Sequence, residues 1–195
     1  MSGQLLIIAG FSCTGKTTYI NAAHNFFGKR IGYRNFYTNR LPRSHKECME
    51  SPDYKFVTNS KYDDLSNQLS WHGVRWYDFY YGFYIHQEIT YLKEGGTIMV
   101  GTPPHTSYLA DMQEIHGHAN ITSIFLNVPY SVIRSRLNKR PPHERTRIRE
   151  FNQNKIDNYA KIADIVFTPK NEIVTDCKEF LAIIARLLSI RNCKF

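Results

Sequence analysis

Residues 4–17 read QLLIIAGFSCTGKT, and this stretch decides the fold. Its first half is an apolar run of strand length, typical of a strand that is buried on both faces. Its second half, residues 10–17, fits the pattern G-x-x-x-x-G-K-S/T at every position. A helical pattern follows over residues 16–27 and ends at a glycine. A strand, a glycine loop and a helix in this order predict a phosphate-binding loop.

The loop is expected to bind nucleotide phosphates through its backbone and two side chains. Gly10 and Gly15 let the backbone curl so that successive N–H groups point at an anion, and the helix N-terminus adds partial positive charge. Lys16 would reach the β- and γ-phosphates as a catalytic residue, and the Thr17 hydroxyl would ligate Mg²⁺. We therefore expect ATP and Mg²⁺ as cofactors. The expected cofactor-binding residues are Gly10, Ser12, Cys13, Thr14, Gly15, Lys16, Thr17 and Thr18.

Composition indicates a folded protein with an anionic partner. The 195 residues are 42% hydrophobic and 14% aromatic, which excludes intrinsic disorder, collagen and a coiled-coil rod. The 25 Lys and Arg residues outnumber the 17 Asp and Glu residues, for a formal net charge of +8. Such a charge favours a nucleotide, a nucleic acid or another polyanion, without choosing among them.

The chain gives no sign of export, membrane insertion or a zinc site. The apolar run Leu5 to Ala9 is too short for a membrane span or for the core of a signal peptide. The four cysteines, at positions 13, 48, 177 and 193, show no C-x-x-C spacing. The pair in His116-Gly117-His118 has no further ligands nearby, so we interpret these histidines as surface residues. A cytoplasmic protein without protein-bound zinc is expected.

Strands alternate with helices along the chain, which predicts an α/β fold with a parallel sheet flanked by helices. Ligands bind at the carboxyl ends of the strands in such sheets. The expected strands are residues 4–10, 31–37, 54–58, 74–81, 97–100, 121–128 and 165–167. The expected helices are residues 16–27, 82–92, 130–137 and 176–190.

A single domain with two inserts is predicted. Its core would comprise residues 1–37, 83–137 and 156–195. Residues 38–82 are polar and turn-rich at their start, where Pro42 and Pro52 are expected to break any helix. This segment and residues 138–155 would overhang the ligand-binding edge as an acceptor-binding insert and a lid.

Five stretches in these regions resemble guanylate kinases. Residues 38–43 (TNRLPR), then Glu47 and DYKFV at 53–57, resemble the nucleotide-monophosphate-binding segment of that family. Residues 80–82 are similar to its Y-Y-G, and residues 136–140 to the start of its lid. Tyr159-Ala160 with Asp164 is similar to its closing Y-A-x-x-D pattern. The collinear resemblance covers roughly residues 4–170 and implies a P-loop kinase fold.

The resemblance implies which residues hold the acceptor. Arg40, Arg43, Tyr54 and Tyr81 would bind its α-phosphate. The residue types suit this role, because guanidinium forks bind phosphate bidentately and phenols donate hydrogen bonds.

The lid residues follow the same logic, because phosphoryl transfer needs positive charge around the migrating group and exclusion of water. Arg136 and Arg140 are candidate catalytic residues, together with Arg147 or Arg149 from the next helix. The choice within the last pair stays open, since an ungapped alignment places the family's arginine at Phe151.

Three positions depart from the family where it reads guanine. Phe36 replaces a Ser, Arg75 replaces a Glu, and the strand end at residues 100–104 lacks the family's carboxylate. Guanine presents N–H donors that need an acceptor, and an Arg offers donors only. We therefore keep Phe36 and Arg75 as acceptor-binding candidates and expect GMP to be a poor substrate.

Three functions remain open: two kinases with different acceptors, and one binding module that does not catalyse a reaction. The first is an ATP-dependent phosphotransferase that acts on a nucleotide other than GMP. The second is a kinase of the same fold that phosphorylates a hydroxyl on a (modified) base within DNA, with Phe36, Trp71, Trp76 and residues 77–83 as candidate stacking residues. The third is a guanylate-kinase-like binding module, against which Lys16, Thr17 and the basic lid argue.

Overall fold

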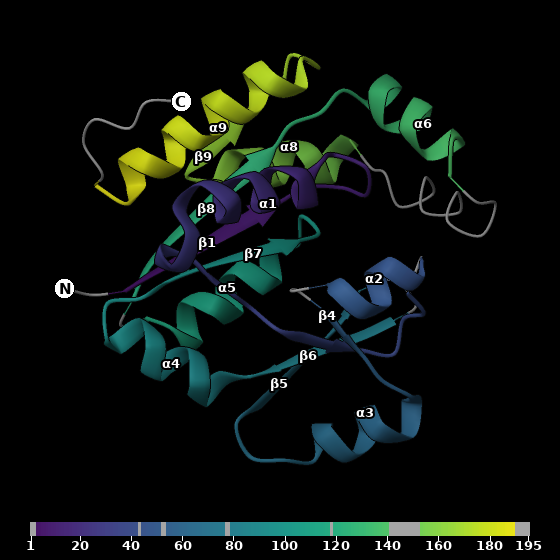
Figure 1. Cartoon of the computed structure of the whole chain (residues 1–195), viewed down its shortest axis with the longest axis vertical. Coiled ribbons are helices and arrows are strands. Elements are labelled where there is room, and N and C mark those ends of the chain that lie inside the picture. The colour runs from purple at the N-terminus through teal and green to yellow at the C-terminus, as the bar shows by residue number, and fades with distance from the viewer. Residues whose placement is uncertain are drawn as a thin grey trace.

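The computed structural model describes residues 3–42, 44–51, 54–76, 79–117, 119–140 and 153–189. These residues form a five-stranded sheet and a four-stranded sheet, which Figure 1 shows in the upper and lower parts of the molecule. The five-stranded sheet is parallel in the order β2-β7-β1-β8-β9. Its strands are β1 (Gln4–Ala9), β2 (Gly32–Tyr33), β7 (Thr97–Thr102), β8 (Asn120–Leu126) and β9 (Ile165–Phe167).

The central strand β1 is buried on both faces, as its apolar sequence requires. Leu6 and Ile8 pack with helices α1 (Lys16–Phe27) and α9 (Ile173–Leu187) on one face. Leu5 and Ile7 pack on the other face with α4 (Ile85–Lys93) and α5 (Thr106–Ile115). Figure 1 shows α1 and α9 above the sheet and α4 and α5 below it.

A third cluster closes the end of the sheet near the phosphate loop, where α6 (Tyr130–Asn138) and α8 (Gln153–Ile162) pack. Within it, Tyr159 is fully buried. The Asp164 carboxylate accepts hydrogen bonds from the backbone N–H and the hydroxyl of Ser123, at 2.7 and 2.8 Å. The closing Y-A-x-x-D stretch therefore ties the end of α8 to β8.

The four-stranded sheet belongs to the insert and has the order β4-β3-β6-β5. Strands β5 and β6 form an antiparallel hairpin, and β3 pairs with β4 in parallel. The inner face of this sheet shares one hydrophobic cluster with the face of β1 that carries Leu5 and Ile7. The insert is therefore packed onto the core. Its elements are β3 (Phe36–Thr38), α2 (His45–Glu50), β4 (Tyr54–Phe56), α3 (Asn59–Ser66), β5 (Trp71–Trp76) and β6 (Phe79–Tyr84).

The predicted α/β fold with its parallel sheet is confirmed, but two predicted strands are wrong in extent. Residues 31–37 divide into β2 and β3, which lie in different sheets. Residues 74–81 belong to both arms of the hairpin, so the following helix begins at Ile85 and not at residue 82. Gly82 lies within β6, where the Trp71 ring covers it so closely that a Cβ would collide with the indole.

Helices also occur where the prolines were expected to prevent them. Ser44 caps α2 by accepting from the Glu47 N–H, and Thr58 caps α3 by accepting from the Lys61 N–H. Pro42 precedes the first cap, so it does not interrupt the helix. The short helix η1 (Gly28–Arg30) follows α1. The four-stranded sheet spans residues 36–84, compared with the predicted insert at 38–82.

Residues 141–152 of the predicted lid lie outside the described residues. Among the residues that are described, no helix has the length and apolar character needed to cross a membrane.

Candidate functional site

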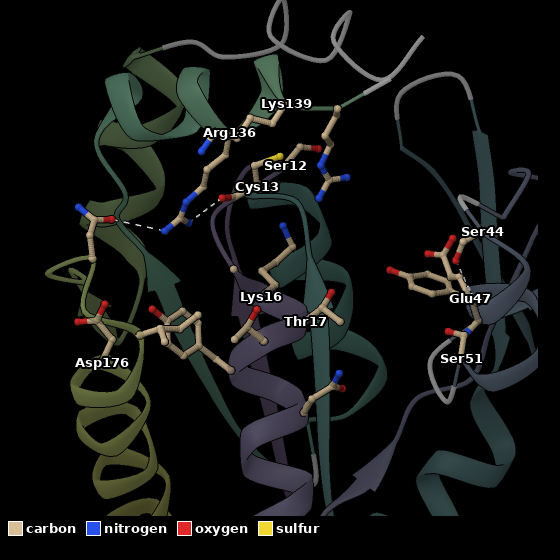
Figure 2. A pocket seen from close by; sticks show the side chains of 18 residues that line it. Ser12, Cys13, Lys16, Thr17, Ser44, Glu47, Ser51, Arg136, Lys139 and Asp176 are labelled. Carbon is tan, nitrogen blue, oxygen red and sulfur yellow. Dashed lines mark hydrogen bonds between the residues drawn. The ribbon is translucent and has the colours of Figure 1, made fainter. Parts of the chain in front are cut away.

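A cleft of about 860 Å³ opens between the phosphate loop and the insert. Ser12, Cys13, Lys16 and Thr17 line it from the loop and the start of α1, as Figure 2 shows. Ser44, Glu47, Ser51 and Tyr54 line the opposite wall, contributed by the insert. Two groups of side chains line the remaining side. Arg136, Lys139 and Arg140 come from the end of α6 and the residues after it, and Asn171, Ile173 and Asp176 come from the start of α9 and the turn before it. The cleft therefore brings together three of the predicted regions.

The phosphate loop has the backbone conformation that an anion site requires. Gly15 has φ 99° and Cys13 has φ 67°, both in the left-handed region, and such turns direct N–H groups into one concavity. The buried Thr14 hydroxyl donates to the Phe11 carbonyl at 2.9 Å, which holds the loop. The Thr14 side chain therefore stabilises the loop and does not point toward the cleft.

Lys16 and Thr17 occupy the start of α1, beside the cleft. The Lys16 ammonium donates to the carbonyls of Gly10 and Phe11, at 2.6 and 2.9 Å, so its charge lies over the loop. Thr17 and Thr18 are exposed at the first turn of the helix. This places a cation and a hydroxyl at the N-terminus of a helix, where phosphate binding is favoured.

Arg136 connects the phosphate loop to the turn between β9 and α9. Its guanidinium donates to the Cys13 carbonyl at 2.9 Å and to Asn171 Oδ1 at 3.4 Å (Figure 2). Lys139 and Arg140 follow at the same rim of the cleft. The predicted pair Arg136 and Arg140 is therefore beside the phosphate loop. Arg147 and Arg149 lie outside the described residues.

Arg40 forms a forked ion pair with Glu47 in the insert wall. Its two terminal nitrogens donate to the two carboxylate oxygens at 3.2 and 2.9 Å, and the rings of Tyr54 and Phe56 lie 5.3 and 5.1 Å from the guanidinium. Burial alone would lower the pKa of Arg40, but the Glu47 carboxylate raises it above the usual value. Arg40 is 5% exposed and the Glu47 side chain is 20% exposed, so the carboxylate is the more open partner.

The structure brings Arg40, Tyr54, Tyr81 and Phe36 together, as expected for one site. Tyr54 and Tyr81 have ring centroids 6.2 Å apart, and Phe36 packs edge-on against Tyr81 at 6.2 Å. Phe36 is 1% exposed, however, inside an aromatic cluster with Trp76. It therefore presents no face to the cleft and cannot stack on a base as placed. Arg43 lies outside the described residues.

Arg75, a predicted acceptor-binding residue, lies away from the cleft. Side chains alternate along a strand, and Val74 and Trp76 pack into the inner face of the insert sheet. Arg75 is exposed on the outer face, where its guanidinium lies 5.6 Å from the Tyr80 ring. Counting residues before the Y-Y-G stretch did not reveal the face on which a side chain lies.

A second forked ion pair, between Arg34 and Glu88, was not anticipated. Arg34 donates to both carboxylate oxygens at 2.6 Å and also to the Tyr108 hydroxyl, and its guanidinium lies 3.9 Å from the Phe83 ring. Burial opposes both charges, but each partner favours the other, so the pKa of Arg34 is raised and that of Glu88 is lowered. The sequence signal that could have indicated this pair is an arginine within the predicted strand 31–37.

His116 belongs to this buried pair, so its interpretation as a surface residue was wrong. Its side chain is 0% exposed, and Nε2 lies 3.3 Å from Glu88 Oε2. Arg34 also lines a small void of about 20 Å³ beside Lys16, Thr17 and Tyr54. The buried ion pair therefore lies directly beneath the cleft.

The end of β7 offers a hydroxyl where a carboxylate would commonly support Mg²⁺. Thr102 pairs with Ala9 beside the phosphate loop, and its buried hydroxyl has no hydrogen-bond partner among the described residues. Those residues contain no group of three His, Cys, Asp or Glu that could hold a metal ion. The arrangement fits Mg²⁺ that arrives with a nucleotide and is held by the Thr17 hydroxyl, phosphates and water.

The fold is similar to that of guanylate kinase. The structure of guanylate kinase from Anaplasma phagocytophilum superposes with a TM-score of 0.68, at 16% identity, over 99% of this chain and 88% of that chain. A shikimate kinase from Bacteroides thetaiotaomicron, at 14% identity, has a TM-score of 0.49 over 95% of this chain and 98% of that one. No protein-family model and no curated protein sequence matches the chain. The predicted guanylate-kinase-like P-loop kinase fold is thus confirmed.

Proposed function

We propose that this protein is an ATP-dependent phosphotransferase that moves the γ-phosphoryl group of ATP to a nucleotide other than GMP. The observation that carries this proposal is that the glycine loop and side chains of the insert face each other across one cleft. Lys16 and the left-handed turns of the loop form one wall. Glu47 and Tyr54 line the other wall, and Arg40 lies behind Glu47 as its ion-pair partner. Three further cations line the rim at the end of α6.

ATP would place its phosphates on the loop and its adenine toward Arg136, Asn171 and Ile173. Ile173 lines the cleft and is 62% exposed, which suits contact with a flat base. Lys16 would exchange the carbonyls of Gly10 and Phe11 for the β- and γ-phosphates, where its charge stabilises the transition state. When bound, Mg²⁺ neutralises phosphate charge, and the Thr17 hydroxyl would hold it.

The acceptor phosphate would bind at Arg40 and Tyr54. The Glu47 carboxylate already holds the Arg40 fork in the geometry that suits an oxyanion, and it is open enough to move aside. A phosphate in its place keeps the guanidinium paired with an anion. The Tyr54 hydroxyl would add a neutral donor. With this exchange, the insert wall would bind the acceptor through its phosphate, without contact to its base.

GMP is disfavoured because none of the three positions at which guanylate kinases read guanine presents a carboxylate to this wall. Phe36 is buried, Arg75 lies on the outer face, and the end of β7 carries Thr102. A buried donor without a partner costs about 1–3 kcal/mol, or about one to two orders of magnitude in discrimination.

A hydroxyl on a base within DNA is the alternative acceptor. It relied on aromatic side chains that could stack on bases, but Phe36, Trp76, Tyr81 and Phe83 are buried in the shared core. This placement favours a free nucleotide over a polynucleotide in the cleft. DNA binding measured at two salt concentrations separates the two, because a polynucleotide acceptor predicts affinity that falls steeply with salt.

The proposal is tested by transfer of labelled phosphate from ATP to a panel of acceptors. The panel contains the ribo- and deoxyribonucleoside monophosphates and several single- and double-stranded DNAs, with the Lys16→Ala variant as the control for contaminating kinases. We expect transfer to at least one monophosphate other than GMP or dGMP. Transfer to GMP faster than to every other acceptor, or no transfer to any monophosphate, would contradict the proposal.

A further inference from the structure

A second hollow, of about 250 Å³, lies between the core and the insert on the far side from the cleft. Its walls come from β2 and α4 of the core and from β3, β4 and β6 of the insert, and it shares no lining residue with the cleft. Tyr54 and Lys55 are neighbours in β4, yet Tyr54 lines the cleft and Lys55 lines this hollow. We call it the hinge groove, because the chain passes between core and insert at its edge.

The walls of the hinge groove are aromatic and held in place. Tyr33 stacks on His24 with ring centroids 3.2 Å apart, and Tyr37 meets Tyr84 edge-on at 5.7 Å. The Tyr84 hydroxyl donates to Gln68 Oε1 at 2.6 Å, which fixes that ring from outside. Aromatic rings with fixed orientations favour a flat aromatic ligand, because little conformational entropy is lost when it binds.

The polar groups of the groove match the edges and the charge of a nucleotide. Asn35 and Gln87 are exposed at its lining, and each amide offers both donors and an acceptor, as a base edge requires. The Lys55 ammonium lies 3.4 Å from the Tyr37 hydroxyl, at the exposed end of the lining. Glu88 also lines the groove, but Arg34 neutralises it. Lys55 therefore gives the lining a positive charge.

We propose that the hinge groove binds a nucleoside monophosphate, either free or as one unit of a single strand. The base would lie between the tyrosine rings with its edge toward Asn35 and Gln87, and the phosphate would pair with Lys55. A volume of about 250 Å³ is below the usual range for drug-sized ligands, about 300–1,000 Å³, and suits one ring system. The site is separate from the cleft, so the proposal does not depend on the reaction performed there.

Isothermal titration calorimetry tests this site in a protein whose cleft is impaired by Lys16→Ala and Arg40→Met. The probes are the four deoxyribonucleoside 5′-monophosphates, a short single-stranded oligothymidylate and deoxyribose 5-phosphate as the base-free control. We expect at least one nucleotide to bind. Gln87→Ala and Lys55→Ala should each weaken that binding about 3- to 10-fold, as expected for loss of one hydrogen bond or charge contact. Gln113→Ala and Lys161→Ala, exposed on α5 and α8, are the matched controls.

Fluorescence of Trp71, which packs on two tyrosines of the groove, gives a second measurement. The Trp71 ring lies 5.6 Å from Tyr37 and 5.2 Å from Tyr84, and the chain has two tryptophans. In a Trp76→Phe protein, a nucleotide in the groove should change Trp71 emission with the affinity found by calorimetry. If this variant does not fold, the calorimetric series stands by itself.

The arms of the calorimetric series distinguish the two sources of the nucleotide. Tighter binding of the oligothymidylate than of dTMP identifies a single strand, and equal or weaker binding identifies a free nucleotide. The proposal is overturned if no nucleotide binds to the cleft-impaired protein, or if the groove variants bind as well as their controls. Binding of deoxyribose 5-phosphate as tightly as the nucleotides would equally overturn it.

Discussion

Two arginine–glutamate forks, one in the cleft wall and one beneath it, differ in what surrounds them. The Arg40–Glu47 side chains are 5% and 20% exposed, whereas those of Arg34 and Glu88 are 0% and 9% exposed. Glu88 is also close to His116, and Arg34 also donates to Tyr108. The comparison teaches that the same pair of residues can serve two roles. We propose that the open pair exchanges its carboxylate for a phosphate, whereas the closed pair links α4 and α5 to the chain between β2 and β3.

The two walls of the cleft differ in the chemical groups that they present. The proposed donor wall consists of backbone N–H groups in left-handed turns and one lysine. The proposed acceptor wall consists of side chains from α2, β4 and the segments beside them, so its specificity would depend on individual residues. The predictions below test these two contrasts, from the largest expected effect to the smallest.

Removal of one partner of the buried fork should strongly destabilise the protein. Arg34→Met leaves the Glu88 carboxylate buried without its main partner, which should lower the free energy of unfolding by about 3–5 kcal/mol. The double variant Arg34→Met/Glu88→Met removes both charges and should recover most of that loss. Urea unfolding followed by circular dichroism measures both. If Arg34→Met stays within about 1 kcal/mol of the parent, the contrast between the two forks is wrong.

Turnover at the donor wall should depend on the charge of Lys16. Lys16→Ala should lower kcat about a hundredfold or more for the acceptor found in the panel, because Lys16 acts on charge that develops as phosphate is transferred. Its free energy of unfolding should match that of the parent. Lys161→Ala, which removes an exposed lysine from α8, is the control. Turnover within about threefold of the parent would show that Lys16 is not catalytic.

His24 should make stability depend on pH below neutrality. Burial lowers its pKa to about 4, compared with about 6.5 in an unfolded chain. The unfolded state therefore binds the proton first as pH falls, so stability is complete above about pH 6.5 and declines down to about pH 4. The loss should be on the order of 3 kcal/mol, at 1.36 kcal/mol for each unit of pKa.

The variant His24→Gln should reduce this pH dependence, measured as the free energy of unfolding at pH 7 and at pH 4.5. The half-buried His72 has its pKa lowered by burial too, so a part of the dependence should remain. His86→Gln, at an exposed position of α4, should leave the dependence as it is in the parent. A His24→Gln protein with the full dependence of the parent would contradict the assignment.

Arg75 should have no role in choosing the acceptor base. Because its side chain lies on the outer face of the insert sheet, Arg75→Glu should leave the rates with GMP and with the preferred acceptor within about twofold of the parent. Lys61→Glu, an equal charge change on the exposed side of α3, is the control. A selective gain with GMP in Arg75→Glu alone would place this residue in the acceptor site.

The sequence predicted those parts of the molecule that depend on local pattern. The apolar run of β1, the glycine loop and the α1 helix follow from one motif, because left-handed turns and a helix N-terminus require particular residues at fixed spacing. The association of Arg40, Tyr54 and Tyr81 followed from the family resemblance. The roles of these residues in binding stay predictions.

The sequence did not predict features that depend on which face of a strand a residue occupies. The strand pattern ran through Arg34 and through residues 77–78, so it missed the division of β2 from β3 and of β5 from β6. For the same reason Phe36 and Arg75 were assigned to the acceptor site. Arg34, Glu88 and His116 are distant in sequence, and only the packing of α4 and α5 brings them together.

The division of the cleft into donor and acceptor walls is tested most directly by one kinetic comparison. KM values for ATP and for the preferred acceptor are measured in Arg40→Met and in Arg136→Met. Arg40→Met should raise the KM of the acceptor about tenfold or more and leave that of ATP within threefold, because a hydrogen bond to a charged group contributes about 1.5–3 kcal/mol. Arg136→Met should do the reverse. Equal changes in both KM values in either variant would contradict the assignment of the two walls.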